Sequence, residues 1–319
     1  MFHFHVAGGF IHLVRLCSVV LLTVLGLASA VVAGAAEPVA RFPFEVQANR
    51  IIFPMMVGDS SELKILLDTG LTFEGVYLFH EKMIEELGLT DGVEQDVAGA
   101  GADDPSSSVL KEGATLRVGG IEFQDQRVYV SRSPRTQRFP RDGVAGWTLL
   151  GNYVVEIDHH SMTIALYDKS SYEPDPSWDP IEMTLRHNIP WIDLGISVGG
   201  EEETPAEVYI DLGAGDALLL LVRPEMKFPL PEGMENKYIG TGLSGDIYGD
   251  FGRVASVRIG SHRLKNVVTA FPDAEVRSKQ EGADGIVGSD LLRRFNVIFD
   301  YDRLRIYLKP NRAFGERFE

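Results

Sequence analysis

Cysteine is almost absent from this chain of 319 residues, which has only Cys17. An intramolecular disulfide, a zinc–thiolate cluster and a CxxC redox pair are therefore excluded. The sequence also lacks the HExxH pattern of metalloproteases and the GxSxG pattern of serine hydrolases. Positive charge is scarce, because 30 Lys and Arg stand against 46 Asp and Glu and leave a net charge of −16. An acidic surface repels phosphate backbones, so we expect no nucleic-acid partner.

Charge is nearly missing from residues 1–36, where Arg15 is the one charged side chain. The apolar run 19–33 follows it, and small residues at 28–30 and 33–36 suit a signal peptidase. We therefore predict a signal peptide over 1–36 and an exported protein, periplasmic or secreted. The alternative is an uncleaved membrane anchor, because the run is close to the shortest length that spans a bilayer.

What the chain does contain is an internal repeat, in a composition that is 45% hydrophobic and typical of globular proteins. Three landmarks recur in the same order and at nearly constant spacing. They pair residues 65–70 with 208–213, 116–119 with 257–260, and 142–167 with 284–309. Such spacing indicates one structural unit used twice. We place the two lobes at 42–170 and 181–311, joined by a polar, Pro-rich linker over 168–180.

Within each copy the apolar residues recur mostly with period two, which predicts strands. Residues 154–166 and 296–308 each read as a hairpin, the first turning at the pair His159-His160, which we expect to be solvated. A helix is expected from Leu78 to Leu87, where apolar residues have helical spacing. A second, short helix is expected from Ser289 to Phe295, capped by the Ser289 hydroxyl.

Two aspartates occupy equivalent positions in the repeat. Asp68 and Asp211 each follow a short apolar run, precede a glycine, and stand at almost the same distance before an apolar-apolar-Gly turn. A single Asp-x-Gly is weak evidence, as Asp193-Leu194-Gly195 shows by falling inside an alternating run with no counterpart in the repeat. An Asx turn at a strand end is the alternative reading of each aspartate alone. The occurrence of both aspartates at matched positions of the repeat favours a catalytic role over a purely structural one.

At these residues the chain resembles the pepsin/retropepsin-like aspartic protease family, specifically its bacterial single-chain members with two retropepsin-like halves. The resemblance rests on four blocks: 66–70, 210–214, 285–292 and 295–301. It implies a mainly β, two-lobed pepsin-like fold with few short helices. It also implies an aspartic endopeptidase in which Asp68 and Asp211 activate a water molecule to hydrolyse a polypeptide substrate.

The resemblance implies roles for neighbouring residues as well. Thr69 would orient the two aspartates, and Gly70 and Gly213 would let the two loops approach closely. No metal, cofactor or covalent intermediate is required. A chain that carries both halves has no need to dimerise for a complete site, so we expect a monomer.

The second copy departs from the family pattern at Leu212, where a Thr or Ser normally hydrogen-bonds the opposite loop. Flaps over the substrate are expected at 99–108 and 240–252, with Tyr248 as a residue that covers substrate. Residues 240–245 also match GxGxxG, but no helix pattern follows them, so nucleotide binding is not expected.

Leu212 keeps two other functions open. One is a catalytically weak or inactive protease-like protein that binds peptides or acts as a scaffold in the cell envelope. The other is an unrelated β-rich ligand-binding protein whose Asp-x-Gly turns are purely structural, which requires Asp68 and Asp211 to lie far apart.

Overall fold

The computed structural model describes residues 36–101, 103–200, 202–222, 229–277 and 282–319. All but the last residue of the predicted signal peptide therefore lie outside the described residues. Strands form 53% of the structure and helices 7%, which confirms the mainly β fold. Within the described ranges, no helix has the length and apolar character needed to cross a membrane.

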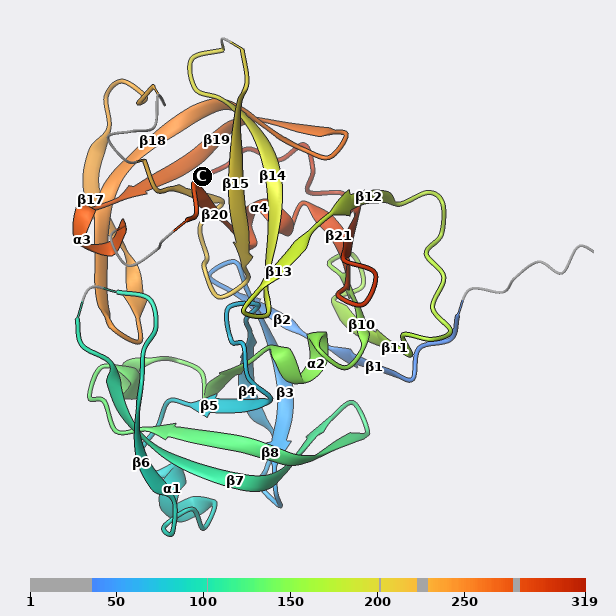
Figure 1. Cartoon of the computed structure of the whole chain (residues 1–319), viewed down its shortest axis with the longest axis vertical. Coiled ribbons are helices and arrows are strands. Elements are labelled where there is room, and N and C mark those ends of the chain that lie inside the picture. Colours follow the sequence, from blue (N-terminus) through green and yellow to red (C-terminus); the bar gives the residue numbers. More distant parts are fainter. Residues whose placement is uncertain (1–35, 102, 201, 223–228, 278–281) are drawn as a thin grey trace, which may run out of the picture. The chain divides into compact units, whose positions relative to one another are not determined.

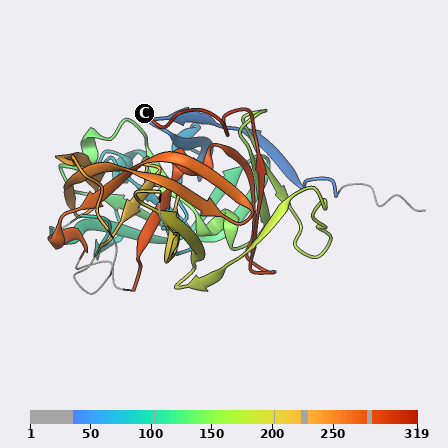
Figure 2. The same cartoon turned by 90° about the horizontal axis from the view of Figure 1, so that it is seen from above.

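The strands of the first lobe form a closed barrel, drawn in blue to green in Figures 1 and 2. They are β2 (Glu45–Gln47), β3 (Arg50–Val57), β4 (Leu63–Leu67), β5 (Gly75–Leu78), β6 (Val93–Val97), β7 (Ser106–Val118), β8 (Ile121–Ser131) and β9 (Gly143–Ala145). Six of them pair in the order β3-β4-β9-β5-β8-β7, and a β3–β7 pairing closes the ring. The pairs β4–β9 and β5–β8 are parallel, so β4 and β9 deliver their carboxyl ends to the same edge.

The second lobe repeats this barrel strand for strand. Its strands are β13 (Thr184–Arg186), β14 (Ile189–Ser197), β15 (Thr204–Asp211), β16 (Leu218–Leu220), β17 (Glu235–Gly242), β18 (Gly245–Ile259), β19 (His262–Pro272) and β20 (Gly285–Gly288). The closed order is β14-β15-β20-β16-β19-β18, with β14–β18 as the closing pair and β15–β20 parallel. The duplicated, two-lobed architecture predicted from the repeat is confirmed.

A third sheet is built from both halves of the chain. Its strands are β1 (Ala40–Pro43), β10 (Val154–Asp158), β11 (Thr163–Tyr167), β12 (Asp179–Glu182), β21 (Phe295–Asp300) and β22 (Arg305–Pro310), in the order β1-β11-β10-β21-β22-β12. The two predicted hairpins are β10–β11 and β21–β22, and they join each other through the antiparallel pair β10–β21. The segment predicted as a linker lies between β11 and β12, and its last two residues belong to β12.

The helices are short, as expected, but two predicted boundaries were wrong. They are α1 (Met83–Glu86), the 3-10 helix η1 (Thr136–Arg138), α2 (Trp147–Leu150), α3 (Ala274–Arg277) and α4 (Ser289–Leu292). Leu78 belongs to strand β5, which lies between β8 and β9 and is buried on both faces. A strand buried on both faces has a continuous apolar run, which the pattern of the sequence confused with the first turn of a helix.

The predicted cap of the last helix is also corrected. Gly288 is the residue before α4, the helix ends at Leu292, and Phe295 starts β21. The Ser289 hydroxyl does not cap the helix but donates to the carbonyl oxygen of Leu212, 2.7 Å away. The local sequence predicted that this hydroxyl caps the helix, but in the folded protein it hydrogen-bonds the neighbouring Asp-x-Gly loop instead.

Strand alternation sends successive side chains of each barrel to opposite faces. Ile51, Phe53, Ile65 and Leu67 pack in the main hydrophobic core, whereas the intervening Ile52 and Leu66 join a separate cluster on the other face. The second lobe has a matching outer cluster that includes Trp191, Tyr209 and Ile286. Asp68 and Asp211 continue the series of Leu66 and Tyr209, two residues on, so each aspartate shares its face with an outer apolar cluster.

Candidate active site

The two aspartates stand where the central strands of the barrels end. Asp68 directly follows β4, and Asp211 is the last residue of β15. We call residues 68–72 loop one and residues 211–215 loop two. Each loop turns against the glycine of the neighbouring parallel strand: a Cβ on Gly146 would lie 1.8 Å from the Asp68 carbonyl oxygen, and one on Gly288 would lie 2.2 Å from that of Asp216. Only glycine fits there, which explains why the Gly-apolar-apolar-Gly block accompanies each Asp-x-Gly.

The two carboxyl groups lie in contact and hydrogen-bond each other. A Cβ at Gly213 would be 2.8 Å from Asp68 Oδ2 and 2.9 Å from Asp211 Oδ1. A side chain at this position would therefore displace both carboxyls, so Gly213 permits the approach of the loops. The requirement of the unrelated ligand-binding interpretation, that the aspartates lie far apart, is contradicted.

The surroundings of the pair separate the two carboxyls into different protonation states. Burial and the negative charge of Asp211 raise the pKa of Asp68 well above its usual value, against one backbone hydrogen bond from Gly70 at 2.6 Å. Burial also raises the pKa of Asp211, but the hydrogen bond from Asp68 and the backbone N–H groups of Gly213 and Ala214, at 2.8 and 3.2 Å, oppose that rise. The pair therefore shares one proton, and the surroundings favour the protonated form at Asp68 more than at Asp211.

Thr69 links the two lobes from a fully enclosed position, with 2% of its surface exposed. Its hydroxyl donates to the carbonyl oxygen of Ile210 at 2.6 Å and accepts from the backbone N–H of Leu212 at 3.1 Å. One side chain of loop one thus satisfies two backbone groups at the start of loop two.

Leu212, the counterpart of Thr69, returns no such bond. Its side chain is 2% exposed and packs in the main core, not in either of the outer clusters that share a face with the aspartates. It therefore neither covers Asp68 and Asp211 nor crosses to loop one. The backbone of Leu212 is held from behind by the hydroxyl of Ser289.

Sequence reasoning missed a reciprocal pair of asparagines. Asn49, in the β2–β3 turn, donates to the carbonyl oxygen of Gly215 in loop two at 3.1 Å, and Asn188, in the β13–β14 turn, donates to that of Thr72 in loop one at 2.9 Å. Both have left-handed backbones, with φ of 65° and 68°, which asparagine tolerates better than most residues. The sequence did contain a signal for this pair, because an asparagine occupies the equivalent turn in each copy of the repeat.

Arg50 strengthens this attachment on one side only. Its Nε donates to the carbonyl oxygen of Gly213 at 2.6 Å, and its positive charge lowers the pKa of Asp68 and of Asp211 against the effect of burial. The corresponding residue of the second lobe, Ile189, follows Asn188 and has no polar group in its side chain.

The hairpins predicted as flaps contact each other. Ser244, between β17 and β18, accepts from the backbone N–H of Asp103 at 2.6 Å and donates its own to the carbonyl oxygen of Ala100 at 2.9 Å. Leu243 packs against the outer apolar cluster of the first lobe, which contains Leu71 and Phe139. Tyr248 lies further back on β18, is 47% exposed and stacks edge-on against Tyr238. Leu243, which the sequence did not single out, is thus the residue of this hairpin that packs against the first lobe, and the role of Tyr248 stays a prediction.

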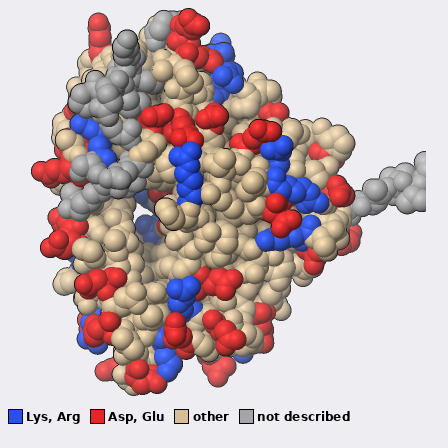
Figure 3. Space-filling view, in the orientation of Figure 1, with Lys and Arg blue, Asp and Glu red and all other residues tan. Residues whose placement is uncertain are grey.

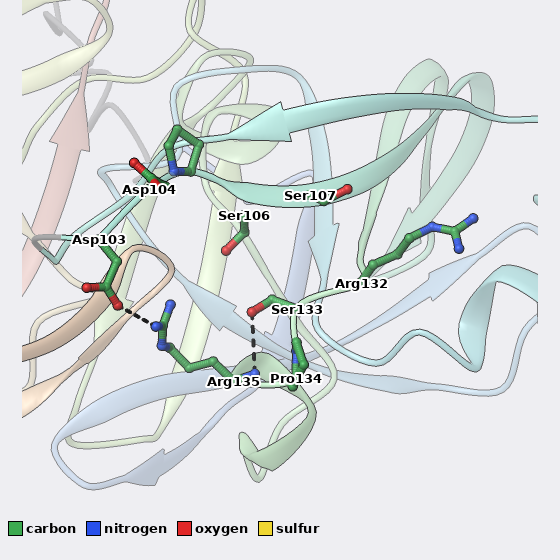
Figure 4. A pocket seen from close by; sticks show the side chains of 9 residues that line it. Asp103, Asp104, Ser106, Ser107, Arg132, Ser133, Pro134 and Arg135 are labelled. Carbon is green, nitrogen blue, oxygen red and sulfur yellow. Dashed lines mark hydrogen bonds and ion pairs between the residues drawn. The ribbon is translucent and has the colours of Figure 1, made fainter.

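A polar hollow of about 640 Å³ lies beside this contact, between the first flap and the end of β8 (Figure 4). Arg135 closes one side by pairing with Asp103 at 2.5 Å and by donating to the carbonyl oxygen of Leu243 at 3.2 Å. None of the residues that line the hollow belongs to loop one or loop two.

The described residues contain no cluster of three or more His, Cys, Asp or Glu side chains suited to a metal ion. Of the histidine pair, His160 is exposed, but His159 is partly buried against the ring of Phe44, with centroids 5.4 Å apart. The expectation that both histidines are solvated was therefore wrong for His159, whose pKa burial lowers to about 4.

Two closed barrels that each contribute an aspartate to one contact define a two-lobed, pepsin-like protein. Residues 53–152 match the family model described as aspartyl protease, so this part of the chain is a domain of the aspartyl protease family. The matched stretch contains Asp68-Thr69-Gly70 but ends before Asp211. No curated protein matches the chain.

Proposed function

We propose that this protein is an exported aspartic endopeptidase that hydrolyses peptide bonds with Asp68 and Asp211. The observation that carries the proposal is the direct hydrogen bond between two partly buried carboxyls with unequal surroundings. Two carboxyls in contact cannot both ionise cheaply, so they hold one proton between them, which is the state that acid–base hydrolysis needs.

The reaction follows from that state. Asp211, ionised, takes a proton from a water molecule as the water oxygen attacks the carbonyl carbon of the substrate. Asp68 gives its proton to the carbonyl oxygen, so a neutral tetrahedral diol forms. Asp211 then gives the proton it took to the peptide nitrogen while Asp68 takes one from a hydroxyl of the diol, so the C–N bond breaks, the carboxylic acid and the amine leave, and the pair returns to its starting state. Because the site works with one proton on the pair, we expect an acidic optimum.

The test is cleavage of an unfolded protein by the purified mature chain at several pH values. Asp68→Asn and Asp211→Asn should each abolish cleavage, since each removes one of the two proton carriers. Asp193→Asn is the matched control, because Asp193-Leu194-Gly195 is the same tripeptide as loop two but stands exposed in β14. A cleavage pattern that persists in the Asp68 and Asp211 variants would contradict the proposal.

The second candidate function is a weak or inactive protease-like protein that binds peptides or serves as a scaffold in the cell envelope. The lost hydroxyl at Leu212 favours it, because the side chain at that position forms no hydrogen bond with loop one. Leu212→Thr and the similarly shaped Leu212→Val separate the hydroxyl from the loss of core volume. A large gain in cleavage with Thr but not with Val supports a weakened enzyme, and peptide binding without cleavage in all three forms supports the scaffold.

We also propose export by the predicted signal peptide and action as a monomer. The N-terminal sequence of the protein recovered from outside the cytoplasm should begin near residue 37, after the small residues at 33–36. Light scattering of that mature form should give the mass of one chain. Retention of Arg15 in a membrane fraction would instead identify an uncleaved anchor.

A further inference from the structure

Arg141 is a basic side chain in the neighbourhood of the aspartates that the mechanism does not use. It lies in the segment between η1 and β9, where its guanidinium stands 5.9 Å from the centre of the Phe139 ring. Phe139 packs against the outer apolar cluster of the first lobe, together with Leu71 of loop one and Leu243 of the opposite flap. Arg141 is therefore at the edge of the apolar surface that shares its face with Asp68.

This guanidinium has no partner of its own in the described part of the chain. Its Nε is buried without a hydrogen bond, and none of its nitrogens forms an ion pair with a described residue. Burial lowers the pKa of Arg141 to about 10, and repulsion from Arg50 adds to the effect. Arg141 is still fully charged at neutral and acidic pH, so the protein keeps a partly desolvated, unpaired cation beside its candidate active site.

The nearby groups cannot neutralise this cation. Arg50 carries the same charge and is already bonded to backbone carbonyls. Asp68 is the one acid whose charge acts on Arg141, and Asp68 is the member of the pair whose surroundings favour the protonated, neutral form more strongly. In Figure 3, both acidic and basic atoms are spread over the visible face, and basic atoms are also seen within the hollow left of centre.

A partly buried arginine without a counter-ion is costly unless a ligand supplies the missing charge. Its planar fork matches a carboxylate, with which it forms two parallel hydrogen bonds. From this geometry we propose that Arg141 is a specificity residue that selects polypeptide substrates with a carboxylate next to the scissile bond. The carboxylate belongs either to an Asp or Glu side chain or to the end of the substrate chain.

This inference rests on the proposed function, because it assumes that the bound peptide is cleaved. The preference of Arg141 for a carboxylate can nevertheless be measured by binding alone, without cleavage. The Asp211→Asn form is titrated with labelled peptides that differ only by Glu or Gln at one central position, each with a free or an amidated C-terminus, and fluorescence anisotropy gives the affinities. We expect Glu peptides to bind about 10- to 100-fold more tightly than Gln peptides, the range of a charge-assisted hydrogen bond. If Arg141 instead binds the C-terminal carboxylate of the peptide, amidation of that terminus will weaken binding and the Glu→Gln change will not.

In the same titration, the Arg141→Leu variant should bind the peptides with and without the carboxylate equally, with an affinity ratio of about 1. Arg138→Leu is the matched control, because Arg138 lies three residues earlier, is exposed and carries the same charge. Arg141→Leu removes a desolvated cation that Arg50 repels, so thermal unfolding should be no earlier than in the parent, which separates a specificity role from a structural one.

Two results would overturn the inference: equal affinity of the parent for all four peptides, or a carboxylate preference that survives Arg141→Leu. Neither depends on catalysis. In the cleaving, unsubstituted enzyme, sites in an unfolded protein should be enriched in Asp or Glu beside the cut, and Arg141→Leu should lose that enrichment. Absence of any cleavage with an intact Glu preference would refute the endopeptidase but not the role of Arg141.

Discussion

The two Asp-x-Gly loops have equivalent positions in the duplicated fold but are held in different ways. Loop two and the strand before it receive four hydrogen bonds from the first lobe: two with the Thr69 hydroxyl, one from Asn49 and one from Arg50. Among the described residues, one side chain of the second lobe bonds a backbone group of loop one: Asn188, which donates to the Thr72 carbonyl oxygen. The second lobe, which has Leu212 in place of a hydroxyl residue, is thus the lobe whose Asp-x-Gly loop receives more hydrogen bonds from side chains of the other lobe.

This difference shows how a duplicated site tolerates an asymmetric substitution. In the symmetric arrangement each hydroxyl would fix the opposite loop, so the loss of one should leave loop one less well fixed than loop two. Loop one keeps its shape by internal bonds, from Gly70 N–H to Asp68 Oδ1 and from Trp147 N–H to the Leu71 carbonyl oxygen. The carboxyl with the single backbone donor, Asp68, is also the one whose pKa is raised well above its usual value.

The largest effect that distinguishes the loops is expected at their glycines. Gly213→Ala places a Cβ within 3 Å of both carboxyls, whereas Gly70→Ala places one 3.0 Å from Asp68 Oδ1 and 3.9 Å from Asp211 Oδ1. Displacing reacting groups by about 1 Å costs about 100-fold in rate, so we expect that loss for Gly213→Ala and a loss of about tenfold for Gly70→Ala. Peptide-cleavage kinetics check this, and equal losses would mean that the loops are equally tolerant.

Next in size is the loss of the cross-lobe hydroxyl. Thr69→Val leaves the Ile210 carbonyl and the Leu212 N–H buried without partners, which should cost about 2–6 kcal/mol of unfolding free energy. Urea unfolding measures it. Thr72→Val is the control, because Thr72 is partly buried in the same loop and offers only its backbone carbonyl to the other lobe. A cost below that of the control would show that the two Thr69 bonds do not hold the lobes.

The unequal carboxyls predict a pH dependence of stability. Because the pKa of Asp68 is raised in the folded protein, the folded state binds this proton more tightly than the unfolded state. The folded state therefore loses stability as pH rises from near 3.8, the unperturbed value, through the raised pKa.

Asp68→Asn should remove this loss, so its unfolding free energy relative to the parent should increase between pH 4 and pH 7. The difference between the two proteins cancels acids with lowered pKa, such as Asp158, whose effect has the opposite sign. Asp193→Asn should show no such trend. A difference that stays constant with pH would mean that Asp68 does not carry the proton.

The smallest effects are expected at the two turn asparagines. Asn49→Ala and Asn188→Ala each remove one hydrogen bond to a loop carbonyl, worth about 1 kcal/mol of unfolding free energy. Their effects on cleavage should differ, because among the described residues Asn188 is the one side chain of the second lobe that bonds the backbone of loop one, whereas Asn49 shares that role for loop two with Thr69 and Arg50. A larger fall in kcat for Asn49→Ala than for Asn188→Ala would reverse the comparison.

Much of the fold could be predicted because a repeat constrains its two copies together. The apolar runs before Asp68 and Asp211 and the hairpins at 154–166 and 296–308 were each seen twice, and a pattern with period two identified them as strands. The wrong secondary-structure predictions concern residues whose environment is set by contacts with segments distant in the sequence. Leu78 was assigned to a helix because β5 is buried on both faces, and Ser289 was assigned as a cap because its partner, Leu212, is distant in sequence.

For the candidate site, the sequence supplied the two aspartates, Thr69 and the two glycines, since these lie in recognisable tripeptides. It did not supply Asn49, Asn188, Arg50 or Arg141, which belong to turns and loops with no motif. Asn49 and Asn188 could have been noticed as equivalent turn residues, but Arg50 and Arg141 have no counterpart in the second copy.

By itself, then, the sequence determined that the chain is a duplicated β protein with a matched pair of aspartates, because alternation, glycine turns and repeat spacing are local properties of the chain. Only the tertiary structure decided which aspartate has the surroundings that favour protonation more, how Leu212 is accommodated and which cation lies unpaired beside the pair. Those properties depend on burial and on charges brought together from distant segments, and neither has a signature in the order of the residues.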